Sequence, residues 1–231
     1  MKVMKALILA GGLGTRLRPY TSVIPKPLMP VGQKPILEWL LNKMVNNGFE
    51  DIFISVGYLA GLIEAYCGDG SKYGAKITYL REDRPLGTAG PIHLMNDIEE
   101  PFIITNGDIL TDLNYRDLYE YHLSGEQELT VATFNKKTQI PLGVLSISEE
   151  SFIYDYDEKP TLGHDVSMGV YCCSKEILNH VPKNTRYDLP DLVKGLILKE
   201  LKVGSFLHEG KWLDIGNHDD YELAQKEIEN F

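Results

Sequence analysis

The chain has 231 residues, of which 43% are hydrophobic, and its formal net charge is -10. A chain of this length buries roughly 70% of its unfolded surface, so its core needs no disulfide or metal for stability. No apolar run approaches the about 18 residues of a membrane helix. The acidic charge disfavours broad binding to nucleic acid. We therefore expect a soluble, cytoplasmic protein with no membrane or nucleic-acid partner.

The first half of the chain, residues 1–124, alternates strand-like and helix-like segments. Strands are expected at residues 6–9, 52–56, 77–80 and 102–105. Helices are expected at residues 35–47, 59–67, 88–96 and 115–124. This alternation is typical of a parallel α/β sheet.

The second half, residues 125–231, is richer in β-structure. Strands are expected at residues 129–134, 143–147, 152–157 and 166–173, and helices at residues 189–199 and 219–230. We expect this half to fold over the carboxyl ends of the first sheet, where such sheets bind ligands. The predicted fold class is α/β, a Rossmann-like, mostly parallel mixed sheet flanked by helices in one domain spanning residues 1–231.

The three cysteines are Cys67, Cys172 and Cys173. The adjacent pair lies in an apolar stretch, where neighbouring side chains of a strand point to opposite faces. Buried free thiols are therefore expected, and neither a disulfide nor a zinc site is predicted.

A glycine-rich, cationic segment follows the first expected strand. It reads Leu9-Ala10-Gly11-Gly12-Leu13-Gly14-Thr15-Arg16, and the first acidic residue of the chain is Glu38. Glycines let backbone N–H groups approach an anion closely, and nearby cations neutralise it. The segment therefore predicts a phosphate site. It matches neither a P-loop nor the dinucleotide fingerprint, because Leu17 stands at the third glycine position and Pro19 interrupts the expected helix.

Further motifs follow in the order found in a known family. The segment from Leu9 to Pro19 is followed by these strings: Pro25-Lys26-Pro27-Leu28, Pro85-Leu86-Gly87-Thr88-Ala89-Gly90-Pro91, Asn106-Gly107-Asp108, Glu158-Lys159-Pro160 and Trp212-Leu213-Asp214-Ile215-Gly216. Together they resemble the sugar-1-phosphate nucleotidyltransferases, and the resemblance spans almost the whole chain. The strings around Gly87 and Asp214 look most like mannose-1-phosphate guanylyltransferases. The β-helix that many relatives carry at the C-terminus is not expected within residues 1–231.

The resemblance implies attack by a sugar-1-phosphate oxygen on the α-phosphorus of a nucleoside triphosphate (NTP), which releases pyrophosphate. Such a reaction needs positioning and charge stabilisation rather than a nucleophilic side chain. Arg16 is expected to hold the β- and γ-phosphates, and Lys26 to lie near the α-phosphate. The resemblance assigns Asp108 and Asp214 to a Mg²⁺ ion. A turn or cap residue is the alternative reading of Asp108.

Other site residues are implied only by the resemblance. Residues 1–124 would bind the nucleotide and residues 125–231 the sugar. The implied nucleotide-binding residues are Leu9, Ala10, Gly11, Gly12, Gly14, Thr15, Arg16, Lys26, Gly87, Thr88 and Asp108. The implied sugar-phosphate-binding residues are Asn106, Gly143, Glu158, Lys159 and Gly169. Capping of a helix is an equally good reading of Thr88, and Ser167-Met168-Gly169 departs from the Asn-Ala-Gly string of many relatives.

The favoured reaction is guanylyl transfer from GTP to a mannose- or heptose-type sugar-1-phosphate. Uridylyl or thymidylyl transfer to a glucose-type sugar-1-phosphate is the alternative. A nucleotide-sugar-dependent glycosyltransferase would have no use for Arg16 and Lys26 around a triphosphate. A non-catalytic regulatory subunit typically loses a catalytic cation or carboxylate, and both are present here. The resemblance to the sugar-1-phosphate nucleotidyltransferases favours a homodimer.

Overall fold

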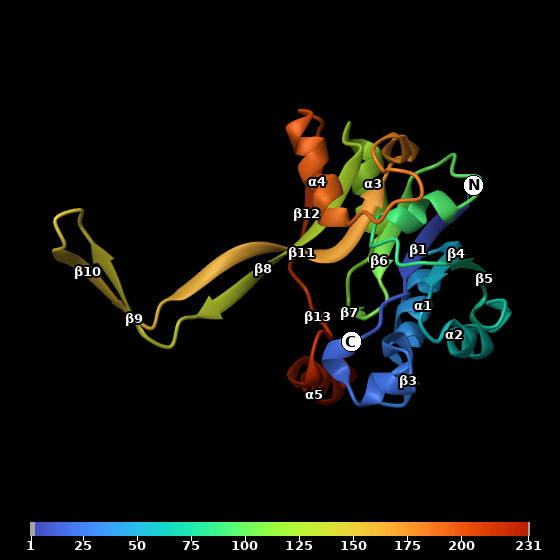
Figure 1. The fold of residues 1–231 in the computed structure, drawn as a ribbon, viewed down its shortest axis with the longest axis horizontal. Helices are drawn as coiled ribbons and strands as arrows, with labels where there is room; N and C mark the ends of the chain where they lie inside the picture. The colour runs from blue at the N-terminus through green and yellow to red at the C-terminus, as the bar shows by residue number, and fades with distance from the viewer. Residues whose placement is uncertain (1–2, 231) are drawn as a thin grey trace.

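A computed structural model describes residues 3–230, and its centre is a seven-stranded sheet (Figure 1). The strand order is β12-β8-β11-β6-β1-β4-β5. All strands run in one direction except β11, which is antiparallel to both of its neighbours. The predicted α/β class with a mixed, mostly parallel sheet is therefore confirmed.

The strands of this sheet are β1 (Met4–Leu9), β4 (Phe49–Val56), β5 (Lys76–Arg81), β6 (Phe102–Asn106), β8 (Leu129–Gln139), β11 (Thr161–Cys173) and β12 (Val203–His208). Three small pairs join β2 (Pro30–Val31) to β3 (Lys34–Pro35), β7 (Ile109–Thr111) to β13 (Trp212–Asp214), and β9 (Gly143–Ile147) to β10 (Ile153–Glu158). The α-helices are α1 (Ile36–Asn46), α2 (Ala60–Cys67), α3 (Tyr115–Ser124), α4 (Leu189–Leu198) and α5 (His218–Glu227).

Helices cover both faces of the sheet. On one face α1 buries Leu37, Leu40, Leu41 and Met44, which recur at helical spacing, in a cluster with side chains of α2 and α3. On the other face α4 packs into a second cluster. Cys172 belongs to the first cluster and Cys173 to the second, and all three thiols are buried and free. The expectation of buried, unpaired cysteines on opposite faces of a strand is confirmed.

One expectation from the sequence is wrong, and another holds only in part. Residues 88–96 do not form an α-helix, because the N–H groups of Ala89 and Gly90 donate to the carbonyl of Tyr187 and only a 3-10 helix, Gly90–Leu94, follows. The second half lies over the carboxyl ends of the first sheet only in part, through β13 and α5, where Ile215 and Ala224 pack against Leu17 and Leu110. Strands β8, β11 and β12 instead extend that sheet, and residues 135–165 project from the body as a long arm, at the left of Figure 1.

None of the helices within residues 3–230 has the length and apolarity that crossing a membrane requires.

His122, in the last turn of α3, is a buried histidine held by two hydroxyl groups. Its Nδ1 lies 2.8 Å from Thr130 Oγ1 and its Nε2 lies 2.9 Å from Ser174 Oγ. Burial disfavours the imidazolium and lowers the pKa of His122 to about 4. The folded protein therefore holds this ring neutral where the unfolded chain protonates it.

We expect this histidine to make the fold acid-sensitive. Because the folded pKa lies below the unfolded one, its contribution is complete above pH 6.5 and is lost as the pH falls toward 4. Between pH 7 and pH 5 the loss should be about 2 kcal/mol of unfolding free energy. Urea unfolding of wild type and His122→Gln at both pH values measures it. An equal change in the two proteins would contradict the assignment.

Candidate active site

The candidate site lies at the point in the sheet where the strand order reverses. Strand β1 has β4 on one side and β6 on the other, and Leu9 pairs with Asn106 where β1 and β6 end. The carbonyl of Leu9 accepts from the N–H of Gly107 at 2.9 Å. Ligands of open α/β sheets bind at such a switch point, outside the carboxyl ends of the strands. Asp108 therefore lies at the strand edge that the sequence predicted.

The segment after β1 presents a row of free backbone donors. The N–H groups of residues 11–16 donate to no other residue within the described range 3–230. Gly14 adopts a φ of +61°, and a Cβ there would lie 2.9 Å from Thr21 Cγ2. Glycine is therefore required at Gly14, and successive unpaired N–H groups form a concave surface suited to an anion.

A buried ion pair lies beside these donors. Lys26 is 9% exposed, and its ammonium donates to Asp108 Oδ2. The flanking Pro25 and Pro27 restrict the backbone of Lys26. This pair joins two residues 82 positions apart. The ammonium group of Lys26 is therefore held in place inside the site by the carboxylate of Asp108.

The small sheet of β7 and β13 positions Asp214 beside Lys26 and Asp108. Asp214 pairs with Ile109, and the N–H of Ile215 donates to the carbonyl of Asp108 at 3.1 Å. Asp214 and Asp108 are therefore neighbours, although they lie far apart in the sequence. The exposed Arg16 completes the group, since its Nη1 would lie 3.3 Å from a Cβ placed on Gly216.

The electrostatics of the two carboxylates favour a bound cation. The pKa of Asp214 is raised, first by desolvation and then by the charge of Asp108, while Lys26 and Arg16 act in the opposite direction. Asp108 Oδ1 is buried and accepts no hydrogen bond from any of residues 3–230. An orphaned carboxylate oxygen next to a second carboxylate fits a hard divalent cation that binds one or two protein oxygens. Within residues 3–230 no group of three or more acidic, His or Cys side chains offers a fuller protein cage.

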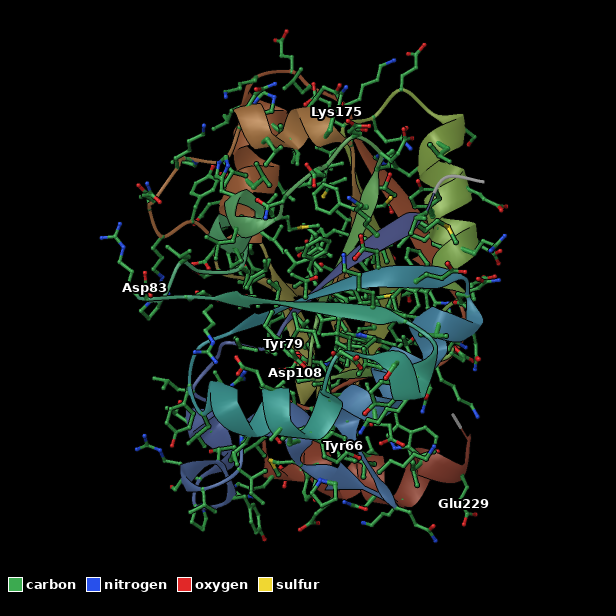
Figure 2. All side chains as sticks on the ribbon, turned by 90° about the vertical axis from the view of Figure 1, so that its right-hand side faces the viewer. Tyr66, Tyr79, Asp83, Asp108, Lys175 and Glu229 are labelled. Carbon is green, nitrogen blue, oxygen red and sulfur yellow. The ribbon has the colours of Figure 1, made fainter. Side chains whose placement is uncertain are left out.

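Two adjoining cavities flank Asp108, which Figure 2 labels near the middle of the molecule. The first, of about 230 Å³, is lined by the loop after β1, by Arg16, Lys26 and Asp108. The second, of about 340 Å³, is lined by Glu82, Gly87, Thr88, Arg186 and Asp188 among others. Both cavities are bordered by Leu9, Gly12 and Asp108. Together they form one cleft.

The second cavity contains residues that the motifs did not single out. Glu82 follows β5, and its carboxylate accepts from the hydroxyl of Ser55 and from the N–H of Leu86. Asp188 Oδ1 accepts from the N–H of Thr88 at 2.9 Å, and Arg186 lies 3.8 Å from Asp188. The position of Glu82 after a parallel strand was the signal in the sequence that could have revealed it.

Thr88 caps a helix, but not the one expected. Its Oγ1 accepts from the N–H of Leu189, the first residue of α4, at 2.7 Å. Gly87 has a φ of +78°, and a Cβ there would lie 2.5 Å from the carbonyl oxygen of Tyr187. The turn is thus pinned against residues 187–189 while it lines the cavity.

The residues expected to bind sugar phosphate are divided by the fold. Asn106 and Gly169 are neighbours, since a Cβ on Gly169 would lie 2.6 Å from Asn106 Nδ2, and Asn106 lines the second cavity. Gly143, Glu158 and Lys159 lie on the arm, which projects from the body (Figure 1), and they line neither cavity of the cleft. The structure of a single chain does not bring the two groups together.

A larger hollow, of about 410 Å³, lies between α1 and β7 and is less suited to an anion. Its cations are Lys34 and Lys43. Lys43 donates to the carbonyl of Asp112, and Lys34 lies 3.4 Å from Glu38. Both charges are therefore already engaged.

Comparisons with known proteins agree with this geometry. The family model described as "Nucleotidyl transferase" matches residues 5–230. The chain is 34% identical to D-glycero-alpha-D-manno-heptose 1-phosphate guanylyltransferase of Aneurinibacillus thermoaerophilus, with 99% of this chain and 100% of that protein covered. It is 32% identical to a UTP--glucose-1-phosphate uridylyltransferase of Synechocystis and 33% identical to a mannose-1-phosphate guanyltransferase of Schizosaccharomyces pombe. The chain spans 65% and 62% of the length of these last two proteins.

Solved structures share the fold. A Bacillus anthracis protein in complex with a sucrose aligns with a TM-score of 0.81 at 24% identity, covering 99% of this chain and 96% of that one. HddC from Yersinia pseudotuberculosis complexed with GMP-PN aligns with a TM-score of 0.71 at 25% identity, covering 98% and 100%.

We expect Asp214→Asn to stabilise the metal-free protein. The pKa of Asp214 is raised in the fold, so its ionised form weakens the fold as the pH rises through that pKa, and an amide removes the repulsion from Asp108. Thermal unfolding at pH 7 in EDTA should give a higher Tm for the variant. Added Mg²⁺ should raise the Tm of wild type and not that of the variant. A lower Tm in EDTA would contradict the paired-carboxylate interpretation.

Proposed function

The chain belongs to the nucleotidyl transferase family, and on that basis we propose that it transfers a nucleotidyl group from an NTP to a sugar-1-phosphate. The observation that carries the proposal is the row of free N–H groups at residues 11–16 beside the pair of Lys26 and Asp108. This arrangement suits a polyphosphate chain, which needs several donors and a fixed positive charge along its length.

The reaction requires the side chains to position the substrates and to stabilise charge, and it requires no nucleophilic side chain. A phosphate oxygen of the sugar-1-phosphate forms a bond to the α-phosphorus, and the bond from that phosphorus to the bridging oxygen of pyrophosphate breaks. No proton has to move, because the attacking phosphate is already an anion. Lys26 balances charge at the α-phosphate, and Arg16, which also lines the first cavity, binds the β- and γ-phosphates that leave.

Asp108 and Asp214 are the residues that would hold Mg²⁺ in this reaction. Asp108 Oδ1 has the free lone pairs, since Oδ2 is taken by Lys26. Bound there, Mg²⁺ supplies positive charge to the phosphate oxygens.

GTP is the proposed nucleotide, and Glu82 supports that choice. Guanine presents its N1–H and its amino group as adjacent donors, whereas uracil and thymine present carbonyl oxygens on both sides of one N–H. Glu82 lines the second cavity, and its carboxylate is oriented by Ser55 and by the N–H of Leu86. A fixed carboxylate can accept both guanine donors and would repel a carbonyl oxygen.

The proposed acceptor is a mannose- or heptose-type sugar-1-phosphate. The 34% identity to a heptose 1-phosphate guanylyltransferase over its full length supports this choice, as does the likeness to HddC in complex with GMP-PN. The similarity to a glucose-1-phosphate uridylyltransferase keeps uridylyl transfer as the second candidate. Asn106 and Gly169 lie where the cleft could contact the sugar.

Arg16→Ala and Lys26→Ala should each lower kcat by roughly 10²- to 10³-fold, the scale of losing one preorganised charge-stabilising group. Arg16 is exposed and supports no core, so the fold should survive its loss. Pyrophosphate release with GTP and mannose- or heptose-type sugar-1-phosphates measures the effect. Lys43→Ala is a control, since this lysine lies on α1 outside the cleft. Activity within threefold of wild type for either cleft variant would contradict the assignment of that residue to the phosphates.

We expect GTP to exceed UTP, dTTP and CTP in kcat/KM, and Glu82→Gln to reduce that preference. An amide in place of Glu82 leaves one guanine donor unpaired, which should cost about ten- to hundredfold in kcat/KM for GTP and little for UTP. Asp83→Asn is the matched control, because Asp83 is exposed and does not line the cavity. A preference for UTP or dTTP in wild type would overturn guanylyl transfer and leave nucleotidyl transfer intact.

A further inference from the structure

The arm, residues 135–165, is built as two successive ribbons. Pairs from Thr133 with Ser167 to Gln139 with Thr161 continue β8 and β11 beyond the body for about 20 Å, and the hairpin of β9 and β10 follows. Because β11 runs antiparallel to β6, with Val170 paired to Thr105, the arm leaves the sheet at the edge where the cleft lies. It then points away from the body (Figure 1).

The arm exposes apolar side chains that its own chain does not cover. Phe152, Ile153 and Tyr154 are 69%, 60% and 73% exposed, and Leu142, Leu145 and Ile147 are exposed as well. Two-stranded ribbons without a packed face are at best marginally stable in water, and large exposed apolar patches mark contact surfaces. The arm therefore needs a covering surface.

The root of the arm is fixed in its outward direction. Met168 is 1% exposed, and its carbonyl accepts from Trp212 Nε1 at 3.1 Å. Phe134, on the opposite strand, packs on Trp212 with ring centroids 5.4 Å apart. These contacts hold the root of the arm in the outward direction seen in Figure 1, in which the hairpin of β9 and β10 lies away from the body of its own chain. In this arrangement the surface that covers the hairpin belongs to another molecule.

A polar group is already arranged where the two ribbons meet. Tyr156 lies over Gly143, where a Cβ would be 2.2 Å from the tyrosine oxygen, and its hydroxyl donates to Glu158 at 2.8 Å. Lys159 has a φ of +54° although it is not glycine and precedes Pro160. Backbone strain of this kind clusters at functional sites. Yet Glu158 and Lys159 face solvent, with side chains 57% and 58% exposed.

The cleft lacks what the arm carries. Two of the three cations that line its cavities, Lys26 and Arg186, already face the carboxylates of Asp108 and Asp188. Lys26, Arg16 and the proposed Mg²⁺ are all assigned to the triphosphate, and a sugar phosphate would add further negative charge to the cleft. A further ammonium, with a carboxylate to accept from sugar hydroxyls, would complete the site.

We propose that the arm of each chain covers the cleft of a second copy of this chain, and that Glu158 and Lys159 contact the sugar phosphate bound there. This inference rests on the proposed function. Glu158 pairs with Gly143 and Tyr156 with Leu145, so Leu145, Tyr156 and Glu158 share one face of the hairpin. A two-fold exchange then buries both arms and completes both clefts with one contact used twice.

The first test is the mass in solution and the exposure of the cleft. The 26.0 kDa chain should behave as a dimer in light scattering, and Phe152→Asp with Tyr154→Asp should make it monomeric. Leu198→Asp, which changes an exposed leucine of α4, should leave the dimer intact. Amide exchange at residues 11–16 should be slower in wild type than in the monomeric variant, because only a covering partner protects these groups. A monomeric wild type, or equal exchange, would overturn the proposal.

The second test is complementation between inactive variants. Lys159→Ala should lose more than tenfold in turnover while staying dimeric. Mixed dimers of Lys159→Ala with Lys26→Ala regain one complete site, so a refolded equal mixture should recover about a quarter of wild-type activity. Lys26→Ala mixed with Arg16→Ala should recover none, because both changes lie in the same cleft.

Absence of rescue, or full activity of Lys159→Ala, would show that Lys159 does not act from a partner. If wild type releases no pyrophosphate from any triphosphate and sugar phosphate, the proposed function fails instead. The mass and amide-exchange measurements then still decide whether the arms are exchanged.

Discussion

Two neighbouring carboxylates, Asp108 and Asp214, set the constraint on which the rest of the site depends. Desolvation and repulsion from Asp108 raise the pKa of Asp214, so its ionised form destabilises the fold. Asp214 stays in this position because β13 pairs with β7 and fixes it beside Ile109. Lys26 compensates only one oxygen of Asp108. The other oxygen of Asp108 accepts no hydrogen bond from residues 3–230, and Asp108 borders both cavities, so a cation bound there would compensate the remaining negative charge.

The elements that local sequence determines were predicted well, and the contacts between distant segments were not. The apolar run of β6 and the glycine after it placed Asp108 at a strand end, because strand length and direction are local properties. The pairing of Lys26 with Asp108, 82 residues apart, came only from a family resemblance. Strand β13 has three residues, too few for a period to be read, so nothing local in the sequence predicts that Asp214 lies beside Asp108.

For the arm, too, the sequence predicted the strands but not what they contact. Residues 143–147 and 152–157 were predicted as strands, and β9 and β10 confirm that prediction. Their alternating apolar residues indicate a covered face, but a single sequence does not say whether the cover belongs to the same chain or to another. The expectation that this half folds over its own sheet assumed the same chain. Met168 and Trp212, which direct the root of the arm outward, gave no such signal in the sequence.

The two cavities meet at Asp108, and this has a consequence for selectivity. The turn of Gly87 and Thr88 is held against residues 187–189 by the cap on α4 and by a backbone approach that admits no Cβ. Glu82 is held equally firmly by Ser55 and the N–H of Leu86. If the second cavity holds the base, as we propose, its rigid walls would force a base that does not fit to move as a whole. The same displacement would shift the α-phosphate away from Lys26, so a mismatched base would lower kcat as well as affinity.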